Sequence, residues 1–332
     1  MTWDERVDAI AAHARGVTDR QAAFLVTVML HAGVCMDRHY CTFAHIAHGQ
    51  KTTDFFRRLV DRGYATAHSC RNNSARLFHI QYKPLYAAIG DPDSRHRKPT
   101  PLARAIERLM VLDAVLADRG RTWLATEQDK LTHFTLTHRI PRQDLPSLTF
   151  RSEDTETVRY FPDKLPIGVD LEGAYTFIYI VTRPGPVDFR AFLERHAELL
   201  RALRTWTIRL LVPRHFARVL GVYRAAFREQ LAMPLRPTNL DDLRWYFHAR
   251  QAPSRSSEER FDQAARAFRA PRFRALYRAW LERGEPVLDA TLSAVLADKI
   301  ERQVGQLECH VLPHHYLDLS PLVGTVLPAT AA

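Results

Sequence analysis

Residues 34–80 decide the fold expected for this chain: VCMDRHYCTFAHIAHGQKTTDFFRRLVDRGYATAHSCRNNSARLFHI. The spacing of apolar residues predicts a short helix over 36–48, with Phe43, Ile46 and Ala47 on one side. Gly49 and Gln50 break this pattern, and a second helix is predicted up to Arg62. The stretch therefore begins as two short helices joined by a tight turn.

The second helix has a clear start, face and end. Thr52 or Thr53 is expected to cap it by accepting a hydrogen bond from an unpaired backbone N–H. Gly63 is expected to end it in the left-handed conformation that glycine tolerates. Its apolar residues fall at i, i+3 and i+4 and are expected to face the core: Phe56, Leu59, Val60.

Two strands, 64–70 and 75–81, are predicted to follow as a hairpin with its tip at 71–74. Helix, turn, helix and hairpin in this order are typical of a winged helix-turn-helix, which places one helix in the DNA major groove. The alternative is a small helical domain of another kind with the same order. On the DNA-binding interpretation, eleven residues are expected to approach DNA: Lys51, Thr52, Thr53, Arg57, Arg58, Arg62, His68, Arg71, Asn72, Asn73, Arg76.

The overall charge favours a polyanionic partner. The 332 residues contain 47 Lys+Arg and 37 Asp+Glu, a net charge of +10, and residues 1–100 contribute 14 Lys+Arg against 9 Asp+Glu. Double-stranded DNA is the expected partner. No apolar run approaches the roughly 20 residues of a spanning helix, and no signal peptide is recognised, so a cytoplasmic location without a membrane partner is expected. A homodimer remains open.

Neither a metal nor another cofactor is expected. Four cysteines in a long chain argue against a disulfide framework. Cys35 and Cys41 near His39, His45 and His48 lack the spacing of a zinc site, and these histidines are expected to be polar surface residues or to face the DNA groove. The C-terminal Cys309 with three nearby histidines lacks supporting carboxylates. No phosphate-binding or dinucleotide-binding glycine motif is present.

The chain divides into four predicted segments. Residues 1–90 form the winged helix domain and residues 91–101 a linker rich in Pro, Asp and Arg, whose basic residues either follow a phosphate backbone or are solvated. Residues 102–213 form a small α/β domain, in which YTFIYIV from Tyr175 has the continuous apolar pattern of a central strand. Residues 214–332 form a helical region, in which Pro271 should kink or split a long helix. The expected class is α+β.

Three segments of the chain resemble the bacterial replication-relaxation family associated with plasmids and other mobile elements. They are Val17–Gln81, the WLATE motif at Trp123–Glu127, and the YFPD motif at Tyr160–Asp163 with the hairpin and helix that follow up to Val212. The resemblance covers about the first two thirds of the chain. It implies a DNA-binding winged helix joined to a domain similar to the PD-(D/E)xK nuclease fold.

That nuclease arrangement needs a carboxylate at the start of the sheet and an Asp/Glu-x-Lys pair on the next strand. Asp163 and the helical Glu127 match the first elements, but the strand where the pair belongs reads Tyr179-Ile-Val-Thr-Arg183. Asp170 and Glu172 belong to a turn, with no lysine at the right step. If the domain were active, its catalytic residues would be Glu127, Asp163 and Glu172. We expect a degenerate domain without nuclease chemistry.

The expected function is thus a DNA-binding protein of a bacterial mobile element or plasmid, acting as a transcriptional regulator or accessory factor. One alternative is a metal-dependent DNA nuclease or relaxation enzyme. Another is an interaction module in which the arginine-rich helices after residue 214 bind a recombinase or transposase.

Overall fold

The computed structural model describes all residues except 71–74, 152–155, 252–257 and 317–332. It is a mixed α+β protein, about 55% helical and 16% strand. The chain forms two compact units: unit 1 comprises residues 1–126 with those from 311 onward, and unit 2 comprises residues 127–310. None of the described helices has the length and apolarity needed to cross a membrane.

Unit 1 begins with two helices and ends with a long helix and a short strand. Thr18 caps the second helix in a reciprocal arrangement with Gln21. The elements in order are α1 (Trp3–His13), α2 (Asp19–His31), β1 (Val34–Met36), α3 (Asp37–Ala44), α4 (Gln50–Asp61), β2 (Ala65–Ser69), β3 (Arg76–Ile80), α5 (Lys83–Ala88), α6 (Leu102–Ala117) and β4 (Thr122–Leu124).

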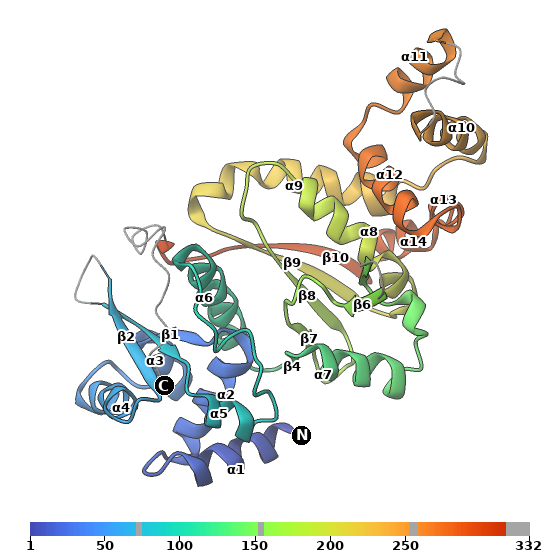
Figure 1. The fold of residues 1–332 in the computed structure, drawn as a ribbon. Coiled ribbons are helices and arrows are strands. Elements are labelled where there is room, and N and C mark those ends of the chain that lie inside the picture. The colour runs from blue at the N-terminus through green and yellow to red at the C-terminus, as the bar shows by residue number, and fades with distance from the viewer. Residues whose placement is uncertain (71–74, 152–155, 252–257, 317–332) are drawn as a thin grey trace. The chain divides into compact units, whose positions relative to one another are not determined.

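The strands β1, β3 and β2 form an antiparallel sheet in that order (Figure 1). On β3, Phe78 stacks on Phe56 of α4 with ring centroids 4.2 Å apart. Phe24 of α2 contacts the rings of Tyr40 and Phe55. The aromatic side chains of α2, α3, α4 and β3 therefore share one core, which fixes α4 against the sheet.

The segment 91–101, predicted as a linker, is packed against the core of unit 1. His96 is 7% exposed, and its carbonyl oxygen accepts a hydrogen bond of 2.9 Å from Nε2 of the buried His79. Gly33 has a φ of +70°, and a Cβ there would lie 2.3 Å from that same carbonyl oxygen. These contacts pack the predicted linker onto unit 1. Unit 1 also contains α6, so its boundary lies at residue 127 and not at the predicted residue 102.

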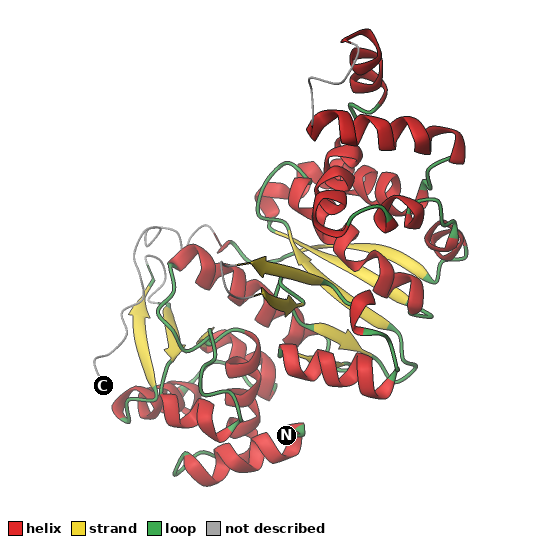
Figure 2. Ribbon diagram, turned by 45° about the vertical axis from the view of Figure 1, so that its right-hand side comes forward, coloured by secondary structure: helices red, strands yellow, loops and turns green. Residues whose placement is uncertain are grey.

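Unit 2 contains both helices and strands up to residue 212 and then mainly helices (Figure 2). Up to β9 the elements are α7 (Glu127–Leu131), η1 (Thr132–Thr137), η2 (Arg142–Asp144), β5 (Ser147–Arg151), β6 (Glu156–Tyr160), β7 (Ile167–Val169), β8 (Tyr175–Ile180), α8 (Val187–Ala202) and β9 (Trp206–Val212). The remainder are η3 (Arg214–Val219), α9 (Leu220–Phe227), η4 (Arg228–Ala232), η5 (Pro237–Asn239), α10 (Leu240–Gln251), α11 (Glu258–Ala267), α12 (Pro271–Arg283), α13 (Pro286–Ala290), α14 (Val295–Glu301) and β10 (Gly305–Val311).

Within unit 2 the strands of the larger sheet are ordered β10-β9-β8-β7. The strand β8 pairs in parallel with β9 and antiparallel with β7, so the prediction of a central strand is confirmed. Helix α8 connects β8 to β9 and packs on the sheet, because Phe189 and Phe192 contact the ring of Tyr179. The strands β5 and β6 form a separate hairpin.

The helices from α10 to α13 enclose a small core of their own. Leu243 and Phe247 of α10 pack with Phe268, which follows α11, and with Leu276 and Trp280 of α12. Pro271 is the first residue of α12, which confirms the predicted split of one long helical pattern into two helices. This region corresponds to most of the predicted helical segment, although the contacts place it in the same unit as the sheet.

Candidate nucleic-acid interface

Helix α4 is strongly amphipathic. Phe55, Phe56 and Leu59 are at most 1% exposed and face the shared aromatic core, whereas the predicted inward Val60 is half-buried. The helix begins at Gln50, and its N-cap is Gly49 in extended conformation, so the prediction that Thr52 or Thr53 caps it is wrong. At the other end Gly63 has a φ of +70°, so the predicted left-handed end is confirmed.

The outward face of α4 is basic. Lys51, Arg57 and Arg58 are exposed. Arg57 forms an ion pair of 2.5 Å with Asp54 one turn away, and its side chain remains 60% exposed. Lys51 and Arg58 have no carboxylate partner within the described part of the chain. An exposed helical face of this kind can make phosphate and base-edge contacts.

Two of the predicted contact residues on this helix are placed differently. Thr52 is completely buried, with its Oγ1 atom 3.6 Å from the sulfur of Cys41, so it is a core residue. Thr53 is half-buried, and its hydroxyl donates to the Gly49 carbonyl. Arg62 is exposed, but its guanidinium lies against Gly16, since a Cβ built there would be 3.3 Å from Nη2. The basic face is therefore centred on Arg57 and Arg58.

The hairpin divides its predicted contact residues between its two faces. Arg76 lies with its guanidinium 5.3 Å from the centroid of Phe78, on the face toward α4. His68 pairs opposite Leu77 and lies on the other face, half-buried, where burial lowers its pKa. Arg71, Asn72 and Asn73 lie outside the described residues.

Helix α3 is bound to α6 through a largely buried polar cluster that the sequence pattern did not reveal. Asp113 of α6 accepts two hydrogen bonds from Arg38, one of them 2.8 Å long, and a third from the hydroxyl of Tyr316. Nε2 of His39 lies 3.1 Å from the same carboxylate. Although burial by itself would raise it, His39 and Arg38 hold the pKa of Asp113 well below its usual range.

The state of His39 follows from its other nitrogen. Nδ1 accepts the backbone N–H of Met36 at 2.8 Å, so the proton of the neutral ring is on Nε2 and points at Asp113. Burial lowers the pKa of His39, which keeps the ring neutral. His39 is thus an internal residue and not the surface histidine expected from the sequence. An Asp in an otherwise apolar helix pattern, VLDAVLA, was the one available signal.

The turn between α3 and α4 is also held by Arg119, which lies just after the end of α6. Arg119 donates to the carbonyl of Thr42 and lies 2.8 Å from Nε2 of His45. Its guanidinium is 5.1 Å from the ring centroid of Phe43. Because His45 is in the left-handed conformation, with a φ of 53°, these contacts stabilise a backbone geometry that non-glycine residues seldom adopt.

The carboxylates proposed for a nuclease site in unit 2 have structural partners. Asp163 forms an ion pair of 2.7 Å with Arg195 of α8. Glu127 accepts the backbone N–H of Tyr160 at 3.0 Å. Asp170 accepts the N–H groups of Glu172 and Ala174 and so shapes the turn before β8. Glu172 is exposed at that turn.

The position expected for an Asp/Glu-x-Lys pair is occupied by Tyr179 on β8. Its ring packs between α8 and α9, against Phe192 and Tyr223. Burial raises the pKa of Tyr179. In the described part of the chain, no three His, Cys, Asp or Glu side chains come together in a way that could hold a metal ion.

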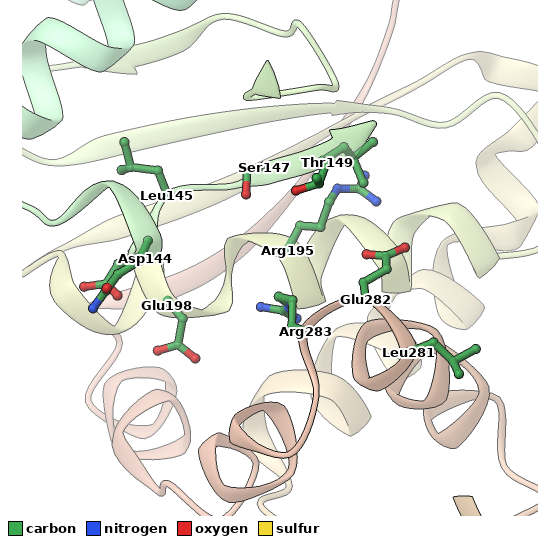
Figure 3. A pocket seen from close by; sticks show the side chains of 11 residues that line it. Asp144, Leu145, Ser147, Thr149, Arg195, Glu198, Leu281, Glu282 and Arg283 are labelled. Atoms are coloured by element: carbon green, nitrogen blue, oxygen red, sulfur yellow. The ribbon is translucent and has the colours of Figure 1, made fainter. Parts of the chain in front are cut away.

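Unit 2 also contains a cavity of about 310 Å³ (Figure 3). Ser147 and Thr149 of β5 form one side, and Arg195 of α8 and Arg283 of α12 lie opposite. Arg195 is bound to Asp163, and Arg283 lies 3.1 Å from Glu194. The burial of Asp144, together with the charge of Glu198, raises the Asp144 pKa. With charges of both signs on its walls, the cavity favours neither anions nor cations.

Comparisons of the chain with protein-family models, with curated proteins and with solved structures found no match.

Proposed function

We propose that the chain binds double-stranded DNA through a winged helix-turn-helix in unit 1, with α4 entering the major groove and the β2–β3 hairpin acting as the wing. The order of α2, β1, α3, α4, β2 and β3 and the sheet order β1-β3-β2 support this assignment. The observation that carries it is the outward basic face around Arg57 and Arg58, opposite a face in which Phe55, Phe56 and Leu59 are buried.

The biological role proposed with it is that of a regulator or accessory factor of a bacterial mobile element or plasmid. It rests on the resemblance of Val17–Gln81 and the two later motifs to the replication-relaxation family. Base-edge contacts from α4 would supply sequence specificity, and phosphate contacts would supply most of the salt-dependent affinity.

The test is the double variant Arg57→Ala/Arg58→Ala on a duplex selected by the wild-type protein from a random library. We expect its affinity to fall at least about 30-fold at moderate salt, because each lost arginine contact removes 1–3 kcal/mol. The melting temperature should stay within about 2 °C, since both side chains are outside the core. Arg15→Ala/Arg104→Ala, which removes the same charge from exposed positions of unit 1, is the matched control. Full binding by the first variant would refute the assignment of α4.

We also propose that unit 2 does not cleave DNA. The ion pair of Asp163 with Arg195 and the hydrogen bonds accepted by Glu127 and Asp170 support this proposal, because each uses a carboxylate that a metal would need. Supercoiled plasmid incubated with the protein and Mg²⁺ or Mn²⁺ should remain intact. Cleavage that is lost in Asp163→Ala would establish the nuclease alternative.

A further inference from the structure

A second basic region lies in unit 2. Residues 266–278, RAFRAPRFRALYR, span the end of α11 and most of α12. They contain five arginines and no Asp or Glu, and the structure describes every one of them. Four of these arginines are exposed: Arg266, Arg269, Arg274, Arg278.

The four exposed arginines lack a carboxylate partner, as do Arg218, Arg224 and Arg228 within the described residues, and Nε of Arg266 donates to the carbonyl of Asp262 at 3.1 Å. Other arginines of unit 2 form ion pairs with a carboxylate: Arg183, Arg190, Arg195, Arg201, Arg209, Arg244, Arg260, Arg283, Arg302. Within the described residues, no carboxylate lies within ion-pairing distance of the four exposed side chains. Arg272, the fifth arginine, is half-buried and donates to the carbonyl of Met233 at 2.8 Å.

The segments that carry the exposed arginines pack against a hydrophobic core. Phe268, Leu276 and Trp280 on the other side of these helices belong to the small helical core. Arg274 and Arg278 are four residues apart on α12, so they project from one face about 6 Å apart along the helix axis. Like charges at this spacing repel each other and destabilise a helix. An anion that binds both would remove that repulsion.

The chemistry of this surface fits a phosphate backbone better than a protein partner. None of the large hydrophobic residues within 266–278 is exposed, so this stretch lacks the apolar centre of a protein interface. Arginine binds phosphate oxygens in a bidentate manner. We propose that Arg266, Arg269, Arg274 and Arg278 form a second DNA contact, which binds backbone phosphates independently of sequence. The choice of duplex DNA as ligand rests on the proposed function.

The experiment measures binding of the full chain to a random-sequence DNA duplex between about 50 and 200 mM salt by fluorescence anisotropy. Since each phosphate contact contributes about 0.9 to the slope of log K against log[salt], Arg274→Gln/Arg278→Gln should lower the slope by about 1.8. Addition of Arg266→Gln and Arg269→Gln should bring the loss to about 3.6. The matched control is Arg183→Gln/Arg302→Gln, which removes two arginines that are 60% and 72% exposed but paired with carboxylates. It should change the slope by less than half as much as the first pair.

Two outcomes would overturn the proposal. One is a quadruple variant whose slope equals that of the control. The other is binding of poly-glutamate that is lost in the quadruple variant while duplex binding is retained, which would indicate an acidic protein partner. The proposed function fails separately: if Arg57→Ala/Arg58→Ala binds the selected duplex fully and the quadruple variant loses slope on the random duplex, the second contact stands without α4.

Discussion

Helices α3 and α4 are neighbours in sequence and each carries an arginine that pairs with a carboxylate, but the two arginines are used in opposite ways. Arg38 of α3 is bound by the carboxylate of Asp113, whose side chain is only 13% exposed and which lies 75 residues away in the chain. Arg57 of α4 is paired only with Asp54 on its own exposed surface. A buried pair fixes the position of a helix, whereas an exposed pair leaves the guanidinium available to a ligand. The comparison shows that charge alone does not distinguish a structural arginine from a binding one.

The largest expected effect tests this contrast directly. Asp113→Ala leaves Arg38 and His39 without the carboxylate that they share, and because this pair is only partly exposed the loss should reach up to about 3–5 kcal/mol. Asp54→Ala removes an exposed pair and should change the free energy of unfolding by less than about 1 kcal/mol. Urea unfolding of both variants, followed by circular dichroism, measures the difference. Equal losses would show that the two pairs are not distinct.

A second prediction concerns pH and the inward side of unit 1. Burial lowers the pKa of His79 to about 4, against 6.5 in the unfolded chain. Above pH 6.5 the neutral ring contributes its full stability. As the pH falls from 6.5 to 4, the unfolded chain binds a proton that the folded chain does not, and stability falls by about 3 kcal/mol.

His79→Gln keeps a donor toward the carbonyl of His96 and cannot titrate. We expect the loss of stability between pH 7 and pH 4 to be smaller in this variant than in the wild type, as thermal melts at several pH values would show. It should not disappear, because burial also lowers the pKa of His39 and His96. Identical pH dependence in both proteins would show that His79 is not a buried neutral group.

The smallest expected effect lies at the end of α4. Gly63→Ala places a Cβ on a backbone with a φ of +70° in otherwise open space, so only the conformational cost of about 1 kcal/mol applies. Gly120→Ala, also in open space but without a positive φ, is the control and should be nearly neutral. Thermal unfolding measures both. If Gly63→Ala left the melting temperature unchanged, the left-handed conformation at Gly63 would not be what ends helix α4.

Features set by neighbouring residues were predictable from the sequence. The capping of α2 by Thr18, the end of α4 at Gly63, the central position of β8 and the split at Pro271 depend on periodicity and on single residues with restricted conformations. The order of two helices and a hairpin was predictable in the same way, but strand β1 was not predicted, and the helix predicted over 36–48 ends at Ala44, so Ile46 and Ala47 lie outside it.

Features that depend on distant contacts were not predictable. Thr52 is buried because α4 begins one turn before the expected cap and rotates that residue toward Cys41. The polar segment 91–101 is packed because Gly33 leaves room for the backbone of His96. The binding roles expected for Lys51, Arg57, Arg58 and Arg76 remain predictions that the DNA-binding experiments will test.

The hydrogen bond from Tyr316 to Asp113 has a consequence for the order of events during synthesis. The two residues are 203 positions apart, and all of unit 2 lies between them. At about 5–20 residues per second, a ribosome needs about 10–40 s after Asp113 to reach Tyr316. Throughout that interval α3 is supported by an incomplete cluster. The nascent chain would therefore acquire its final α3 geometry only after unit 2 has been made.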